Sequence, residues 1–314
     1  MSSSLPASGD GNRQRLGVRP APLASLEASA TRAVRGVLTD IDDTLTHAGA
    51  IEVEALAALH DLRCAGIPVV AVTGRPKGWS EGFARDWPID AIVAENGAVA
   101  LFRETGAGVR EVDPNGGQFA RPGTDEEAGV GEWNGVLRIE FAQDVATRIS
   151  NAVRLQATAE RVLREVPGSR LAADSAGRVT DIAVDHSEFN HLSPAQIAAV
   201  VAVMQQAGMT ATVSSIHING WYGSHDKLSG ARWIVQRLFG RDLDAETDRW
   251  VYVGDSTNDQ LMFGHFPLSI GVANLLRFAD ELTVWPAYLT EGERGAGFAE
   301  VARMLTRRDG DRRR

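Results

Sequence analysis

The chain has 314 residues, of which 44% are hydrophobic and 23% charged, a composition ordinary for a soluble globular protein and sufficient for two domains. The net charge of -9 argues against nucleic acid as a partner, and no apolar run is long enough to span a membrane. The N-terminus lacks the apolar core of a signal peptide. The single cysteine, Cys64, excludes an intramolecular disulfide and favours a cytoplasmic location.

The two ends of the chain carry no periodic pattern. Residues 1–33 are rich in Ser, Ala, Pro, Gly and Arg, which predicts a disordered leader. Residues 307–314 form a charged tail. The folded part is therefore expected between these two segments.

A short apolar strand at Val37 and Leu38 runs into a cluster of acids. Asp40 and Asp42 are two residues apart, so they would face the same side of a continuing strand. Like charges that close resist joint ionisation unless a cation or a shared proton compensates them. The cluster therefore predicts a divalent metal, a carboxylate that does chemistry, or both.

Helices and buried strands then alternate. Apolar residues recur at helical spacing over 53–62, and apolar strands are expected at 68–73 and 91–94. The helix at 53–62 ends near Cys64, where a packed thiol is expected. Short loops between such elements predict a parallel sheet with right-handed crossovers.

The pattern changes in the middle of the chain. Residues 105–133 are poor in apolar side chains and are expected to be loop, and alternating strands at 135–141, 178–184 and 210–216 follow, with helices between them. Alternation indicates a sheet with one covered face. We therefore expect a smaller α/β domain at 106–217, inserted into the first domain.

The first domain is expected to resume at 218 and to end at 306. Lys227 opens a periodic helix, 250–254 is a strand that ends in a second acidic loop, 268–272 is another strand, and a helix closes the domain. The predicted fold is thus α/β: a Rossmann-like, doubly wound parallel-sheet core at 34–105 and 218–306 with a smaller inserted α/β domain.

Polar groups from four separate segments would meet at one edge of this sheet. They are the pair Asp40 and Asp42, the hydroxyl of Thr73, the ammonium of Lys227, and the loop with Asp255, Asn258 and Asp259. Carboxylates suit Mg²⁺, whereas the ammonium and the hydroxyl need an anion, and phosphate fits. A phosphoryl group held in this way is placed for attack by a carboxylate.

This set of residues resembles the haloacid dehalogenase superfamily of phosphohydrolases. The four motifs of that superfamily appear in order as Asp40-Ile41-Asp42-Asp43-Thr44, Val72-Thr73-Gly74, Lys227 and Gly254-Asp255-Ser256-Thr257-Asn258-Asp259. Glu95-Asn96-Gly97-Ala98 and the insertion resemble the branch with a large α/β cap domain, which includes Cof-type sugar phosphatases, sucrose-phosphate phosphatases and phosphomannomutases. The resemblance covers about residues 36–306.

The resemblance implies a role for each matching residue. Asp40 would be the nucleophile that forms an aspartyl-phosphate, and Asp42 would be the general acid and base. Mg²⁺ would be held by Asp40, the backbone carbonyl of Asp42, and Asp255, with Asp259 as a ligand through water or as an orienting group. The phosphoryl oxygens would be bound by Ile41, Thr73, Gly74, Lys227 and Asn258. Asp43 departs from the family, which often has Gly or Asn there, and adds negative charge beside the site.

Candidates for substrate recognition lie in and around the inserted domain. They are Glu95, Asn96, Asp185, Asn219 and Trp221, with Glu188 beside Asp185. Trp221 could pack on a sugar face, or it could pack only the hinge between the domains. His186, Glu188 and His191 do not have the spacing of a zinc helix, so a zinc site is not expected.

Three functions fit these observations. The first is a magnesium-dependent phosphatase that acts on a small, sugar-like phosphomonoester. The second is a phosphomutase, which begins with the same aspartyl-phosphate. The third is a non-catalytic phosphate-binding protein, against which the intact set of Asp40, Asp42, Lys227 and Asp255 argues.

Overall fold

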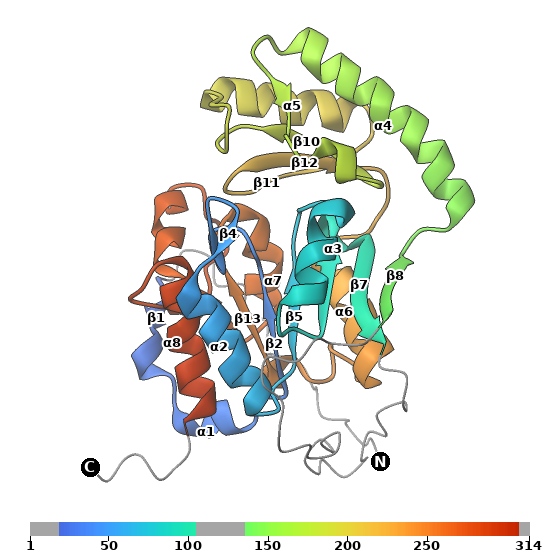
Figure 1. The fold of residues 1–314 in the computed structure, drawn as a ribbon. Coiled ribbons are helices and arrows are strands. Elements are labelled where there is room, and N and C mark those ends of the chain that lie inside the picture. The colour runs from blue at the N-terminus through green and yellow to red at the C-terminus, as the bar shows by residue number, and fades with distance from the viewer. Residues whose placement is uncertain (1–18, 105–135, 308–314) are drawn as a thin grey trace, which may run out of the picture.

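The computed structural model describes residues 19–104 and 136–307, which form a large core with a smaller cap above it (Figure 1). The strands are β1 Ala21–Pro22, β2 Gly36–Thr39, β3 Thr46–His47, β4 Ala50–Ile51, β5 Val69–Val72, β6 Ala91–Ala94, β7 Val99–Glu104, β8 Val136–Phe141, β9 Arg170–Leu171, β10 Asp181–Asp185, β11 Thr210–Val213, β12 His217–Trp221, β13 Trp250–Gly254, β14 Leu268–Gly271 and β15 Tyr288–Leu289. The α-helices are α1 Ala28–Arg32, α2 Val53–Cys64, α3 Lys77–Asp86, α4 Val145–Glu165, α5 Pro194–Gln206, α6 Lys227–Phe239, α7 Gln260–His265 and α8 Arg294–Thr306.

Within the described residues, nine strands form the core sheet, in the order β1-β15-β14-β13-β2-β5-β6-β7-β8. The strands from β1 to β6 in this order are parallel, and β7 and β8 add to the edge as antiparallel strands. The chain proceeds from β2 to one side through β5 and β6, and later to the other side through β13 and β14. The order therefore reverses between β2 and β13, and such a switch point is where ligands bind in open α/β sheets.

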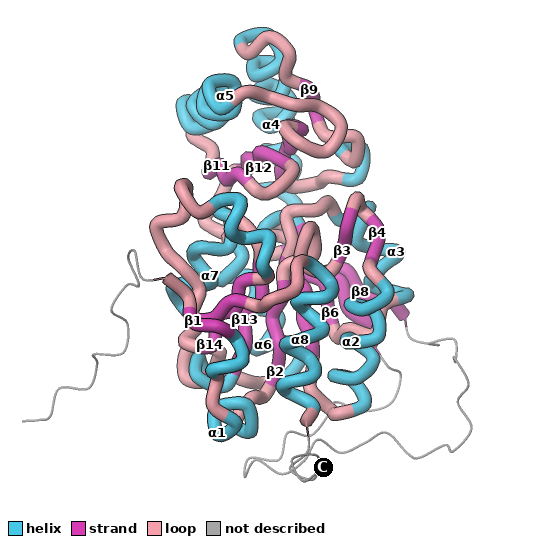
Figure 2. Tube along the Cα trace, turned by 90° about the vertical axis from the view of Figure 1, so that its left-hand side faces the viewer, coloured by secondary structure: helices cyan, strands magenta, loops and turns pink. Residues whose placement is uncertain are grey.

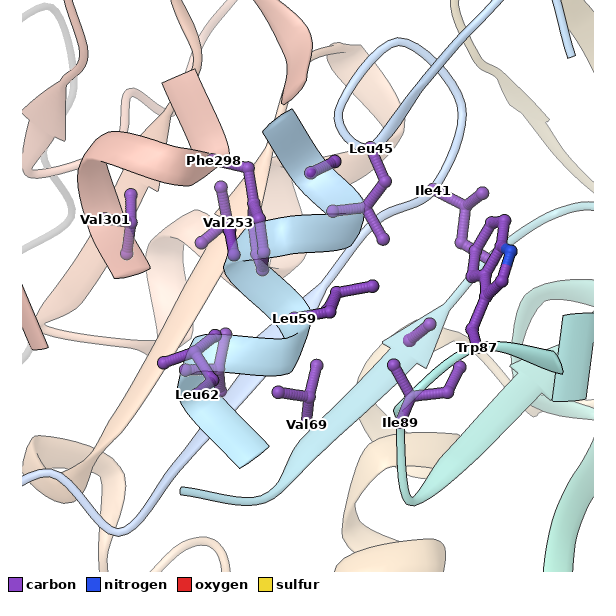
Figure 3. Close-up of a cluster of buried hydrophobic side chains, with 14 of the residues drawn as sticks. Ile41, Leu45, Leu59, Leu62, Val69, Trp87, Ile89, Val253, Phe298 and Val301 are labelled. Atoms are coloured by element: carbon purple, nitrogen blue, oxygen red, sulfur yellow. The ribbon is translucent and has the colours of Figure 1, made fainter. Parts of the chain in front are cut away.

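Both faces of the core sheet are covered by helices, which explains why its central strands are apolar throughout. Successive side chains of β2 point to opposite faces: Val37 joins the apolar cluster under α2 and α8, and Leu38 joins the cluster under α6. Figure 3 shows the first cluster, in which Leu59 of α2 and Phe298 of α8 pack over the sheet. This packing holds the loop after β2 at the upper edge of the core.

The cap contains a four-stranded antiparallel sheet, in the order β11-β12-β10-β9, among the described residues. Helices α4 and α5 cover its upper face, and its other face looks toward the core (Figures 1 and 2). Each of these helices starts at a capped residue: Asp144 accepts the backbone N–H of Thr147, and Ser193 forms a capping box with Gln196. The cap is thus a two-layer unit whose open sheet face lies over the site.

The α/β fold class with a parallel core sheet is confirmed, but three predicted boundaries are wrong. Residues 19–33 do not belong to a disordered leader, because β1 pairs with β15 and Leu23 is buried in the core. The inserted domain does not begin at 106, since β8 pairs with β7 in the core sheet. It does not end at 217 either, because β12 belongs to the cap sheet as far as Trp221.

Three smaller predictions also have an outcome. The thiol of Cys64 is exposed near the end of α2, so the expected packed thiol is wrong. The predicted strand at 210–216 ends at Val213. The loop predicted at 105–133 and the tail beyond residue 307 lie outside the described residues. None of the helices in the described ranges has the length and apolar character needed to cross a membrane.

Candidate active site

Asp40 stands where β2 leaves the sheet. Its backbone N–H donates to the carbonyl of Val253 on β13, so the ladder between the two strands continues up to the acid itself. Its side chain is only 4% exposed. Burial raises the pKa of Asp40 from 3.8 to about 7, although the attraction of Lys227 lowers it. The carboxylate is thus held in a dry position with too little positive charge around it.

Lys227 reaches Asp40 from the first residue of α6. Asp226 caps this helix through a capping box with Ser229, which fixes the direction of the first turn. The buried ammonium lies 2.8 Å from a carboxylate oxygen of Asp40 and 2.7 Å from one of Asp259. These two carboxylates raise the pKa of Lys227 despite the opposing effect of burial, so it stays charged. The predicted convergence of Asp40 and Lys227 is present.

The loop after β13 brings two further carboxylates to the same place. Asp259 is fully used as an acceptor: one oxygen receives the backbone N–H groups of Asp255 and Ser256, and the other receives Lys227 and the hydroxyl of Tyr252. Asp255 has only long contacts, 3.5 Å from the hydroxyl of Thr44 and 3.4 Å from the amide of Asn274. Asp259 is therefore placed to orient neighbours, and Asp255 is free to bind a ligand.

The three carboxylates fit a divalent cation with oxygen ligands. Asp40, Asp255 and Asp259 each offer an oxygen, and these oxygens lie within 4.8 Å of one another. Burial raises the pKa of Asp255 well above its usual value, and the neighbouring Asp40 and Asp259 raise it further. One ammonium cannot balance three buried carboxylates, so the site has room for another positive charge.

The predicted phosphate-binding residues differ in which of their groups remain available for a phosphate. The hydroxyl of Thr73, at the end of β5, accepts the backbone N–H of Arg75 and keeps its own proton for a ligand. The side chain of Ile41 packs in the apolar core (Figure 3), so only its backbone can face a phosphate. The side-chain oxygen of Asn258 accepts the hydroxyl of Ser256.

Asp42, the predicted acid and base, does not join the carboxylate cluster through its side chain. It forms an ion pair with Arg75, whose Nε lies 3.0 Å from both carboxylate oxygens. Arg75 follows Thr73 and Gly74 in the chain and is buried. Arg75 was not among the predicted site residues, so its contact with Asp42 was missed.

Two of the predicted substrate residues, Glu95 and Asn219, instead join the cap to the core, and a third, Asn96, lies beside this contact. Glu95 accepts the backbone N–H groups of Val179 and Thr180 and the hydroxyl of Thr180, all from the cap. Asn219 of β12 donates to the carbonyl of Gly74. The amide of Asn96 lies beside Gly74, and its buried Nδ2 has no partner among the described residues. Asn96 thus keeps a donor without a partner beside Gly74.

The other two predicted substrate residues serve the cap's own structure. The carboxylate of Asp185 accepts four successive backbone N–H groups, those of residues 187–190. Trp221 is buried, donates to the carbonyl of His225 and stacks on its ring, 5.5 Å between centroids. This geometry favours hinge packing over sugar contact. The expectation of no zinc at His186 stays a prediction; its Nε2 meets the carbonyl of Ser214.

Comparison with known proteins agrees with this geometry. Residues 37–110 match the family model of haloacid dehalogenase-like hydrolases. The match includes the loop with Asp40 and Asp42 and the segment with Thr73 and Gly74. No curated protein matches the sequence. Among solved structures, the chain resembles a sucrose-phosphatase from Synechocystis, a HAD/COF-like hydrolase from Plasmodium vivax and the C-terminal domain of a trehalose-6-phosphate phosphatase from C. albicans.

These three structures share the fold at low sequence identity. The TM-scores are 0.55, 0.56 and 0.56, and the identities are 14%, 15% and 12%, respectively. The alignments cover 87%, 89% and 92% of the chain and 98% of each of the other chains. The match to the family model confirms the resemblance inferred from the motifs, and the solved structures show that the fold is shared.

The unusual Asp43 has a structural explanation. Its backbone is left-handed, with φ of 53°, a conformation that Gly and Asn adopt more easily than other residues. Its carboxylate pairs with Arg294 at the start of α8, 2.8 Å away. The charge that the sequence suggested beside the site is thus compensated by a residue far along the chain. Asn274, also missed, links the carbonyl of Asp43 to Asp255.

Proposed function

We propose that the protein is a magnesium-dependent phosphatase that cleaves a small, sugar-like phosphomonoester through an aspartyl-phosphate on Asp40. The observation that carries the proposal is the convergence of Asp40, Lys227 and Asp255 from three separate segments on one buried point. A nucleophile, a positive charge for the phosphoryl group and a metal ligand are the parts that phosphoryl transfer needs.

Asp40 would attack the phosphorus atom and release the alcohol. Its backbone is locked to β13, and its carboxylate is held by Lys227, so its direction is set before substrate arrives. Lys227 and the hydroxyl of Thr73 would bind the phosphoryl oxygens, where negative charge is concentrated in the transition state.

Asp42 would protonate the leaving oxygen and later accept a proton from the water that cleaves the aspartyl-phosphate. It follows Asp40 by two residues, so both belong to one loop, and Arg75 fixes the direction of its carboxylate. A carboxylate at this position separates a phosphatase or mutase from members of the superfamily that transfer phosphate without an acid.

Mg²⁺ would be held by Asp40, Asp255 and the backbone carbonyl of Asp42, with Asp259 orienting Lys227 and the loop. When bound, it would neutralise charge on the phosphoryl group and on the nucleophile. The fit rests on three buried carboxylates whose oxygens lie within 4.8 Å of one another and which share the one ammonium of Lys227.

A sugar-like leaving group is supported by the cap and by the relatives. Sucrose-phosphatase and trehalose-6-phosphate phosphatase are among the structures with this fold.

A mutase would need a positively charged side chain to bind a second phosphate group. Among the described residues at the boundary of cap and core, Arg75 and Arg178 are each paired with carboxylates, which favours hydrolysis of a monophosphate. The cytoplasmic location stays a prediction from the single cysteine.

The test is release of inorganic phosphate from a panel of sugar phosphates, with Mg²⁺ and with a chelator. We expect hydrolysis of at least one sugar phosphate that needs Mg²⁺ and disappears in Asp40→Asn. Formation of an isomer, dependent on a bisphosphate and without free phosphate, would identify a mutase instead. If wild type and Asp40→Asn were equally inert on the whole panel, the non-catalytic alternative would be preferred.

A further inference from the structure

One arginine joins three carboxylates from different parts of the protein. Arg75, in the core loop after β5, contacts Asp42 of the core as well as Asp174 and Glu188 of the cap. The distances between its terminal nitrogens and these carboxylates are 2.9, 3.1 and 2.8 Å. Among the described residues, no other hydrogen bond or ion pair of the Asp42 side chain leads to the cap. We propose that Arg75 is a positioning residue that couples closure of the cap to the orientation of Asp42.

The burial and the planar shape of the Arg75 guanidinium allow it to bind several carboxylates at once. Its side chain is 4% exposed and its plane lies over the ring of Trp79, 5.0 Å from the centroid, which limits its rotation. Its Nε and one terminal nitrogen bind Asp42, while both terminal nitrogens reach cap carboxylates. A lysine carries the same charge but cannot offer this planar fork.

The cap carboxylates are themselves held in place. Glu188 also receives Nε2 of His217 at 2.9 Å, and Asp174 also pairs with Arg178 at 3.0 Å. Burial raises the pKa of Glu188, but hydrogen bonds from His217 and Arg75 outweigh it and lower that pKa to about 2. Glu188 thus remains charged over the working range of pH, and each of the two cap carboxylates has a partner in the cap besides Arg75.

The orientation of Asp42 depends on Arg75 more than the orientation of the two cap carboxylates does. Among the described residues, Arg75 is the one side chain that pairs with Asp42, whereas Asp174 and Glu188 each have a second partner. Without Arg75, three carboxylates would face one another across the boundary, and Asp42 would lose its orientation. An open cap and a misplaced acid are therefore expected together.

This inference rests on the proposed phosphatase, and leaving-group chemistry tests it. 4-Nitrophenolate leaves without a proton, whereas a sugar alkoxide needs one from Asp42. We expect Arg75→Ala to lower kcat/KM on the best sugar phosphate by about 10²-fold, within the range of general acid catalysis, and to lower kcat/KM on 4-nitrophenyl phosphate far less. The ratio kcat/KM is compared because it includes departure of the leaving group but not the later hydrolysis of the aspartyl-phosphate, in which Asp42 would act on both substrates. The values for Arg75→Lys should fall between those of wild type and those of Arg75→Ala.

Two further variants separate positioning from general damage. Glu188→Gln, which keeps the side-chain size, should raise KM for the sugar phosphate more than it lowers kcat, and it should have little additional effect in Arg75→Ala. Arg232→Ala removes an arginine from an exposed pair with Asp244 and should behave like wild type on both substrates. Equal losses on both substrates in Arg75→Ala and Arg75→Lys would overturn the proposal.

Small-angle X-ray scattering provides a readout that needs no turnover. Arg75→Ala should have a larger radius of gyration than wild type, and Arg232→Ala should not. An unchanged radius in Arg75→Ala would also overturn the proposal. If wild type hydrolysed neither substrate, the proposed function would fail, and the scattering comparison would still decide the role of Arg75 in closing the cap.

Discussion

Two groups of carboxylates in the structure have opposite electrostatic states. Around Asp40, three carboxylates share one ammonium, and burial raises the pKa of Asp40 to about 7. At the boundary of cap and core, Glu188 faces a guanidinium and an imidazole, and its pKa falls to about 2 despite burial. The same functional group is thus short of positive charge in one place and well supplied in the other.

The difference indicates two separate tasks. A cluster that lacks positive charge has a site for something that the chain does not supply, here a cation and a phosphorylated substrate. A cluster whose charges are already paired is complete by itself and can hold two domains together. The core cluster is therefore expected to respond to ligands and to pH, and the boundary cluster to mutation of its paired residues.

The largest effect is expected from Asp40→Asn. Loss of the nucleophile should lower kcat by more than about 10³-fold, as loss of a nucleophile does in other hydrolases. Because the raised pKa shows that the charged carboxylate is disfavoured, this variant should not unfold at a lower temperature than wild type at pH 8 in a chelator. Calorimetry and phosphate release measure the two effects. A clearly lower unfolding temperature would contradict the electrostatic contrast between the clusters.

Lys227→Met should reduce stability by about 3–5 kcal/mol, because it leaves buried carboxylates without their ammonium. Urea unfolding at pH 8 would show the loss. The loss should be smaller at pH 5, where Asp40 is protonated, and Mg²⁺ should recover part of it. A loss independent of both pH and Mg²⁺ would mean that Lys227 acts mainly through packing.

The free energy of unfolding is expected to depend on pH through Glu95, at the boundary of cap and core. Burial and the nearby Asp181 raise its pKa from 4.5 to about 7 in the folded state. A raised pKa means that its contribution to stability is complete below pH 4.5 and is lost as the pH rises to about 7, by about 1–3 kcal/mol. Urea unfolding in saturating Mg²⁺ between pH 4.5 and 7.5 would measure this slope, and Glu95→Gln should flatten it. An equal slope in both proteins would assign the dependence to other groups.

The smallest effect is expected from Trp221→Phe. The variant loses one hydrogen bond to the carbonyl of His225, which should cost about 1 kcal/mol of stability. KM for the best sugar phosphate should stay unchanged, because the ring is buried against the hinge. A rise in KM for sugar phosphates, with 4-nitrophenyl phosphate unaffected, would instead support the sugar contact that the sequence also allowed.

The core of the site could be predicted because its residues follow apolar strands. Each of Asp40, Thr73 and Asp255 comes directly after a buried strand, and parallel strands bring their ends to one edge. The boundaries of the cap could not be predicted in the same way. The alternating strand β8 fits the edge of either sheet, and the two-residue strand β1 is too short to show a period.

The sequence by itself determined the α/β fold class and the convergence of nucleophile, ammonium and acids, since apolar periodicity places strand ends and strand ends place these residues. The tertiary structure alone decided how the acid Asp42 is held and what the cap residues do. Arg75 meets Asp174 and Glu188 about 100 positions away in the chain, and Glu95 meets Thr180 in the same way. Contacts across that distance depend on how two domains dock, and no local period or propensity records the docking.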